Sequence, residues 1–227
     1  MDLILRVDLY FLRSTMQARF WIRPLALALA LACVQCEKAT GTTADVKCQT
    51  TKGEVLLKLF PENAPIGVKH LAELIQADFF TNVPLFRTVP GFLMQFGRMV
   101  GNNKWDSDTI KDDHPAKKKL MTRGTLSYAG GGKDSRTNQL FYAFCTSCGG
   151  LGDQPWETPI GQIVGAPSLA VLDALEHAHS YGDMPPWGKG PDPGRIQGDA
   201  DGSYLKLFPK LDYIKGCKMT AEWHHGL

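Results

Sequence analysis

The sequence of 227 residues contains no long hydrophobic run and no clear excess of charge of either sign. The apolar run at residues 25–34 is about ten residues long, whereas a helix that spans a bilayer needs about 20. The formal net charge is +2, from 25 Lys and Arg against 23 Asp and Glu. One basic run, at 117–119, follows Asp112 and Asp113 and is predicted to be a solvated loop. We therefore expect no membrane span in the mature protein and no nucleic-acid partner, which would require clustered basic residues.

Sequence fingerprints of nucleotide and metal binding are also lacking. No dinucleotide Gly fingerprint appears, and strands and helices do not alternate as in a doubly wound sheet. The Gly-rich stretch at 130–133 fails as a phosphate loop, because Ser127 stands where the first Gly is required and Asp134 where a hydroxyl residue is required. Cys145 and Cys148 form a single Cys-x-x-Cys pair, and a zinc site needs two more ligands. The sequence therefore predicts neither a cofactor nor a metal.

Glycine, proline and apolar residues occur in the proportions of a loop-rich globular protein, with 23 Gly, 14 Pro and 44% apolar residues. Arg19 and Arg23 precede the apolar run at 25–34, whose length matches the hydrophobic region of a secretory signal peptide. We interpret residues 1–36 as a signal or targeting leader and residues 37–45 as a linker.

The leader leaves the start of the chain and its destination partly open. Met16 would begin a leader of more usual shape, so residues 1–15 are either an additional targeting extension or an upstream start that is not used. Cys33, after Leu-Ala-Leu-Ala, leaves open a bacterial lipoprotein. We expect the protein in the secretory pathway, in the endomembrane lumen or outside the cell, with a plastid route as the alternative.

Cleavage near Cys36 would leave four cysteines, Cys48, Cys145, Cys148 and Cys217. An even number in an oxidising compartment is compatible with disulfides, and four cysteines allow three connectivities. A bond between Cys48 and Cys217 requires the first and last strand candidates to be adjacent, whereas Cys145 and Cys148 are close enough to pair locally. A redox-active dithiol and unpaired thiols stay open as alternatives for the second pair.

Short strand candidates follow one another from residue 46 onward, with few helices between them. Strands are predicted as a hairpin at 46–60 and singly at 85–98, 125–129, 140–144, 160–164, 204–208 and 211–214. Apolar residues at a spacing of 3.6 predict helices over about 65–77 and 168–180. Short strands with one helix near each end favour a β-barrel closed by two helical caps.

The segment at 181–202 is rich in Gly, Pro and Asp and is too long for an ordinary connector. We expect it to be an ordered surface excursion from a single domain at 46–218. A C-terminal tail at 219–227 then follows.

The stretch at 86–97, Phe-Arg-Thr-Val-Pro-Gly-Phe-Leu-Met-Gln-Phe-Gly, places one Arg and one Gln among apolar residues. Burial of a lone Arg is costly without a partner or a use. Alternation along a strand puts Leu93 and Gln95 on one face and Phe92 on the other, unless the Pro-Gly pair inserts a bulge. The plain alternative is a core strand in which Arg87 forms a structural ion pair.

This stretch resembles the signature of the cyclophilin family, in which an aromatic residue or His precedes Arg, and Pro-Gly-Phe, two apolar residues, Gln and Gly follow. The resemblance continues through 124–129, 137–141 and 160–164 and covers about residues 46–218. It implies a mainly β fold, a closed eight-stranded antiparallel β-barrel capped by two α-helices. It also implies a peptidyl-prolyl cis/trans isomerase that acts as a monomer, without a cofactor, on proline-containing peptides and unfolded proteins.

The family's site residues carry over position by position. Arg87 matches the catalytic Arg, with Gln95 as the second predicted catalytic residue, and Gln95 and Gln139 match polar groups around the substrate backbone. The remaining matches are the proline-pocket walls Phe92, Leu93 and Phe141, the backbone-binding edge Ala129 and Gly130, and a further pocket residue, Leu151.

Three positions depart from the family pattern. Residues 149–150 are Gly-Gly where a Trp often precedes the pocket Leu, Glu157 stands where a His is common, and Gly130 stands where an Asn is common. Trp156 is a candidate substitute for the missing aromatic residue. These departures predict reduced activity and weak binding of cyclosporin-like cyclic peptides, while Arg87 together with Gln95 and Gln139 favours an active enzyme. The alternative function is a non-catalytic proline-peptide binding module or chaperone that uses the same pocket.

Overall fold

The computed structural model describes residues 44–97, 104–178 and 181–220, which belong to the second of two units in the chain, residues 42–227. The predicted leader at 1–36, most of the predicted linker and the end of the predicted tail at 221–227 lie outside the described residues. In the part of the chain that is described, no helix is both long enough and apolar enough to cross a membrane.

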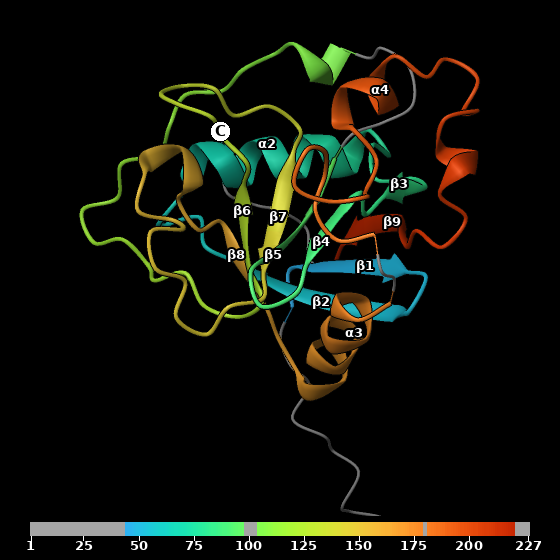
Figure 1. Ribbon diagram of the computed structural model, residues 1–227. Helices are drawn as coiled ribbons and strands as arrows, with labels where there is room; N and C mark the ends of the chain where they lie inside the picture. The colour runs from blue at the N-terminus through green and yellow to red at the C-terminus, as the bar shows by residue number, and fades with distance from the viewer. Residues whose placement is uncertain (1–43, 98–103, 179–180, 221–227) are drawn as a thin grey trace, which may run out of the picture. The chain divides into compact units, whose positions relative to one another are not determined.

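A single antiparallel sheet contains all nine strands assigned to these residues. In sequence order they are β1 (Val46–Thr50), β2 (Gly53–Leu59), β3 (Val83–Pro84), β4 (Arg87–Val89), β5 (Leu93–Phe96), β6 (Thr125–Tyr128), β7 (Leu140–Ala143), β8 (Gly161–Ile163) and β9 (Tyr213–Met219). Their order across the sheet is β3-β9-β1-β2-β8-β6-β7-β5-β4. Because β3 and β4 are the two edges and are joined by residues 85–86 alone, the sheet curls round toward itself (Figure 1).

The predicted mainly β, antiparallel fold is confirmed, but the number of strands differs. The described residues form nine strands rather than eight, because two are gained and one is lost: the stretch predicted as one strand at 85–98 contains the hairpin of β4 and β5, β3 has no counterpart in the prediction, and one predicted strand does not form. The predicted strand at 204–208 is wrong, since a 3₁₀ turn, Leu205–Leu207, lies there. The turn brings the rings of Tyr204 and Phe208 to 5.3 Å, and Phe208 packs against the buried cluster of Phe86, Ile196 and Tyr204.

Two helices flank the sheet, α2 (Pro65–Gln76) and α3 (Ala166–Glu176), as the sequence predicts. The apolar positions spaced along α2 face inward, where Val68, Leu71 and Leu74 are buried. Helix α2 packs against β9 and α3 against β2, and Figure 1 shows the two helices on opposite sides of the strands.

A buried ionic cluster joins α2 to the segment that leads into β7. Arg136 is fully buried, and its Nη1 lies 2.9 Å from Oδ2 of Asp113. The same carboxylate accepts hydrogen bonds from the backbone N–H groups of Ile66 and Gly67 at the start of α2. Because Arg136 comes three residues before Gln139, the cluster fixes where the chain enters β7.

Two disulfide bonds lie within the described residues. Cys48 of β1 lies opposite Cys217 of β9 in the sheet, with a Cα–Cα distance of 4.1 Å, and the two are bonded. The condition that the sequence sets for this pairing, adjacent first and last strands, is therefore met. The second bond joins Cys145 and Cys148 and closes a local loop directly after β7.

The segment at 181–202 folds against the connection between β3 and β4. It contains the short helix α4 (Pro193–Gln197). Ile196 and Tyr204 form a buried cluster of their own with Phe86, the residue immediately before β4. The segment is thereby attached beside the predicted catalytic strand.

Candidate active site

The hairpin of β4 and β5 positions the predicted catalytic pair. Its antiparallel register places Arg87 directly opposite Gln95, so both side chains leave the same face. The turn contains Pro90 and Gly91, and Gly91 has a φ of +73°, a left-handed conformation that favours glycine. The Pro-Gly pair is therefore a hairpin turn rather than a bulge within one long strand.

A line of polar side chains crosses β4 and β5 on this face and ends at Gln139, the residue directly before β7. Arg87 Nη1 donates to Oε1 of Gln95 at 3.2 Å, and Nε2 of Gln95 donates to Oε1 of Gln139 at 3.0 Å. The guanidinium carbon of Arg87 lies 5.8 Å from the centroid of the Phe92 ring. Phe92 belongs to the turn, where strand alternation does not apply, so its ring lies on the side of Arg87 rather than on the opposite face.

An apolar cluster contains two of the residues predicted as pocket walls. Leu93 and Phe141 are only 4% and 1% exposed, whereas Phe92 is 38% exposed. Leu93 and Phe141 can therefore form the floor of a proline site, and Phe92 its accessible wall. Of the other predicted residues, Ala129 and Leu151 pack against the cluster, which also includes three residues that were not predicted for the pocket, Met121, Ala143 and Cys145.

The predicted backbone-binding edge is partly covered by an aromatic side chain. The N–H of Ala129 already donates to the carbonyl of Gln139, at 3.0 Å, within the sheet. Trp156 lies against Gly130, so closely that a Cβ added to Gly130 would be 2.5 Å from Cβ of Trp156. Glycine at this position, where the family often has Asn, is therefore explained by the space that Trp156 occupies.

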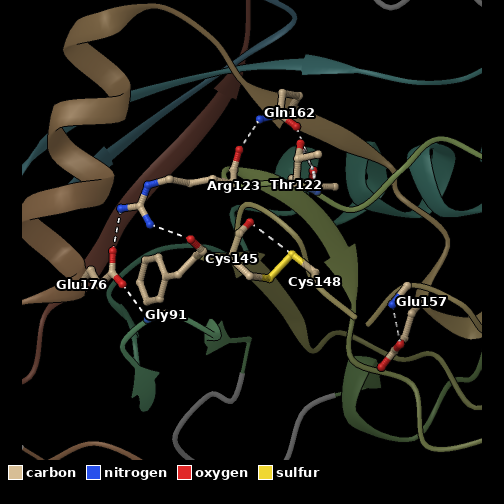
Figure 2. The surroundings of a disulfide bond; sticks show 11 residues. Gly91, Thr122, Arg123, Cys145, Cys148, Glu157, Gln162 and Glu176 are labelled. Carbon is tan, nitrogen blue, oxygen red and sulfur yellow. Dashed lines mark hydrogen bonds and ion pairs between the residues drawn. A yellow bond between two sulfur atoms is a disulfide. The ribbon is translucent and has the colours of Figure 1, made fainter. Parts of the chain in front are cut away.

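A buried carboxylate supports the turn of the hairpin from the other side. Glu176 of α3 accepts a hydrogen bond from the N–H of Gly91 and forms an ion pair with Nη2 of Arg123. Arg123 Nη1 in turn donates to the carbonyl of Phe144. Figure 2 shows Arg123 reaching toward Glu176, whose other oxygen points to Gly91, with the bond between Cys145 and Cys148 nearby.

One residue that contacts the predicted catalytic Arg was not predicted from the sequence. Asp183, from the segment at 181–202, accepts hydrogen bonds from Nε of Arg87 at 2.6 Å and from Nη2 at 3.3 Å. The need of a partly buried Arg for a partner is a signal that such a carboxylate exists, but it does not say which one. The two side chains are 16% and 20% exposed, so Arg87 is ion-paired and still reaches the surface.

Glu157 stands where the family commonly has a His. Burial raises the pKa of its carboxyl above the ordinary value of 4.5, while a hydrogen bond from the N–H of Gly152, at 2.9 Å, acts in the opposite direction. That bond holds Glu157 against the loop that follows Leu151. Glu157 therefore has a structural role here, in holding the loop at Gly152.

Metal ligands do not gather near this site. Across the three described ranges, no group of three or more His, Cys, Asp or Glu side chains is placed to hold a metal ion. The residues that do gather here offer hydrogen bonds, a positive charge and apolar contacts.

Comparison with known proteins gives consistent matches. The family model of cyclophilin type peptidyl-prolyl cis-trans isomerase/CLD matches residues 45–189. A peptidyl-prolyl cis-trans isomerase of Helicobacter pylori strain J99 is 29% identical over 141 residues, 62% of this chain and 85% of the relative. The isomerase cypE of Dictyostelium discoideum is 29% identical over 152 residues, 63% of this chain and 92% of the relative.

A solved structure resembles the fold. It is a crystal structure of a cyclophilin type peptidyl-prolyl cis-trans isomerase of Cryptosporidium parvum in the presence of the dipeptide ala-pro. The TM-score is 0.58 at 17% identity, over 78% of this chain and 99% of that one. At this level of identity the likeness concerns the fold alone.

Proposed function

The chain belongs to the cyclophilin-type peptidyl-prolyl cis-trans isomerase family, and we propose that it accelerates rotation about X-Pro bonds by non-covalent stabilisation of the twisted amide at Arg87. The observation that carries this proposal is the position of the guanidinium. It is hydrogen-bonded to Gln95, stacked near the exposed ring of Phe92, and partly open to solvent.

The reaction needs a charge and a shaped surface, and it needs no nucleophile. The barrier to rotation is about 20 kcal/mol because the amide is resonance-stabilised. In the twisted state the proline nitrogen regains its lone pair, and an N–H of Arg87 can donate to it or to the neighbouring carbonyl. Such a bond is stronger in the twisted state than in either planar form, which lowers the barrier.

The apolar residues next to Arg87 would hold the proline ring. Phe92 offers an accessible aromatic wall above the floor of Leu93 and Phe141. Gln95 and Gln139 present amide groups that can hold the peptide backbone beside the ring. One flank of the peptide would thus stay fixed while the other rotates.

We propose proline-containing peptides and unfolded proteins as substrates, with Ala-Pro as the first probe, because a related fold was crystallised in the presence of that dipeptide. Cyclosporin-like cyclic peptides should bind weakly, since Trp156 fills the space at Gly130 where many relatives carry Asn. A monomer is the proposed functional form, which size-exclusion chromatography with light scattering would test.

We also propose entry into the secretory pathway, the endomembrane lumen or secretion, with a plastid route as the alternative. The predicted leader at 1–36 supports this, and so do two disulfide bonds, since disulfides persist in oxidising compartments. A fluorescent protein fused behind residues 1–36 that stays in the cytosol would contradict it.

NMR exchange spectroscopy on an Ala-Pro peptide tests the central proposal. Wild-type protein should accelerate cis/trans exchange, and Arg87→Ala should lose most of this rate while remaining folded. Lys47→Ala is a control in which an exposed cation of β1, paired with Glu54, is removed instead. Saturable peptide binding without faster exchange would favour the non-catalytic binding module, and a wild-type rate in Arg87→Ala would refute the role of Arg87.

A further inference from the structure

We infer that Asp183 is a positioning residue for Arg87, and that the loop at 181–190 exists to hold its carboxylate against the guanidinium. This inference rests on the proposed role of Arg87. Nothing in the family match or in the signature at 86–97 assigns such a role to this loop.

The loop around Asp183 is closed by its own backbone. Lys189 N donates to the carbonyl of Tyr181 at 3.0 Å, and Gly190 N donates to the carbonyl of Asp183 at 2.8 Å. Oδ1 of Asp183 also accepts the N–H of Met184 at 2.8 Å. The carboxylate is therefore oriented by the loop itself, and not only by its contact with Arg87.

Two glycines make this tight closure possible. A Cβ on Gly188 would collide with the backbone of Asp183, and a Cβ on Gly190 would lie 2.9 Å from the carbonyl oxygen of Asp183 and 3.2 Å from that of Phe86. The loop therefore packs against its own backbone and against the residue before β4. A larger side chain at either glycine would push the carboxylate away.

The closed loop is attached to the catalytic strand by a backbone hydrogen bond. Thr88 N donates to the carbonyl of Gly182 at 3.2 Å, so the loop occupies the edge of β4 that the sheet leaves open (Figure 1, orange beside β4). Thr88 follows Arg87 and Gly182 precedes Asp183. The bond therefore fixes the two backbones that carry the ion pair relative to each other.

The carboxylate holds the guanidinium in one plane. Asp183 accepts hydrogen bonds from Nε and Nη2 of Arg87, and Gln95 accepts one from Nη1, so the guanidinium is held on two sides. Among the described residues these contacts use three of the five N–H groups and leave one on each terminal nitrogen. Those two donors are the ones that the proposed mechanism would offer to a substrate.

The ion pair with Asp183 has two opposite effects on Arg87: it reduces the effective positive charge and it fixes the orientation of the side chain. Asp183 offsets part of the positive charge of Arg87, which weakens its pull on the twisted amide. In return the long side chain is already ordered in the free enzyme, so no ordering is needed when the amide twists. Since misplacement by about 1 Å can cost about 100-fold in rate, we expect orientation to outweigh the lost charge.

The test compares Asp183→Ala and Asp183→Asn with Asp192→Asn in the NMR exchange assay on an Ala-Pro peptide. Asp192 lies in the same segment, and its carboxylate caps Arg195 N, a bond that Asn also makes. We expect Asp183→Ala to lower kcat by roughly 10- to 100-fold with little change in KM. Asp183→Asn keeps one acceptor oxygen, so its kcat should lie between those of the wild type and Asp183→Ala. The kcat of Asp192→Asn should match that of the wild type.

Folding and positioning are separated by two further readings. Thermal unfolding of Asp183→Asn, which is isosteric, checks that the loop survives, and the Nε–H resonance of Arg87 should shift in both Asp183 variants. A wild-type or higher kcat in both Asp183 variants would overturn the inference and leave the proposed function intact. Loss of activity in Arg87→Ala, measured beside them, is the separate test of that function.

Discussion

Glu176 of α3 accepts a hydrogen bond from the backbone N–H of Gly91 at 2.6 Å, and so joins a helix on one side of the sheet to the turn beside Phe92. Its other carboxylate oxygen lies 2.6 Å from Nη2 of Arg123. The side chain of Glu176 is 8% exposed, so this carboxylate is buried and satisfied from both sides. The hairpin that carries Arg87 therefore depends on a residue from a distant helix.

We expect Glu176→Ala to destabilise the protein by about 2–4 kcal/mol, because it leaves the N–H of Gly91 and the charge of Arg123 without their buried partner. It should also slow cis/trans exchange, since the turn before Phe92 loses its support. Urea unfolding measures the first effect, and NMR exchange on an Ala-Pro peptide measures the second.

Asp173→Asn is the matched control for this prediction. Asp173 pairs with the same nitrogen of Arg123, but its side chain is 62% exposed. Solvent screens such a pair, so its loss should cost less than about 1 kcal/mol and leave exchange unchanged. Equal free energies of unfolding for the Glu176 and Asp173 variants would show that the contact with Gly91 does not contribute to stability.

Trp156 occupies the space that a side chain at position 130 would need. In Gly130→Asn the new Cβ would lie 2.5 Å from Cβ of Trp156, so Trp156 must move. We expect this variant to lose about 1–3 kcal/mol of stability, as overpacked sites do. Thermal or denaturant unfolding provides the measurement.

Removal of Trp156 should relieve that conflict. The Gly130→Asn substitution should therefore lower the free energy of unfolding less in a Trp156→Ala background than in the wild type. It should also bind cyclosporin more tightly than the wild type, because Asn would then reach a peptide backbone on the freed edge. If the two substitutions are simply additive in unfolding free energy, Trp156 does not restrict Gly130.

The sequence predicts the residues that lie close together along the chain and misses those that the fold brings from afar. Arg87 and Gln95 are eight residues apart, and the family resemblance predicts both at the site, although the hairpin that places them opposite each other was not predicted. Helix α2 follows from its apolar spacing. In contrast, Asp183 reaches Arg87 across 96 residues, and no local pattern marks it among the other acidic residues of a Gly- and Pro-rich segment.

The same reasoning explains the errors in the fold. The apolar residues at 204–208 resemble a strand, but Tyr204 joins a buried cluster with Phe86, and Phe208 packs against that cluster, which only the folded chain supplies. Trp156 is noted in the sequence as a substitute for a missing aromatic residue, yet only the structure reveals that it covers Gly130. Local periodicity does not report these tertiary contacts.

The carboxyl of Glu157 makes stability depend on pH in a defined direction. Burial raises its pKa in the folded protein above 4.5, and the hydrogen bond from Gly152 only partly offsets this. An acid with a raised folded pKa favours folding while it is protonated. Its contribution is therefore complete below the ordinary pKa and is lost as the pH rises through the folded pKa.

Glu157→Gln should remove this dependence. The variant stays neutral at all pH values, and its Oε1 can still accept the N–H of Gly152. We expect it to match the wild type at about pH 4, where Glu157 is largely protonated, and to be the more stable protein at about pH 8, where a partly buried charge is absent. Melting temperatures measured across this range for both proteins give the comparison, and a difference that stays constant with pH would contradict the role of burial at Glu157.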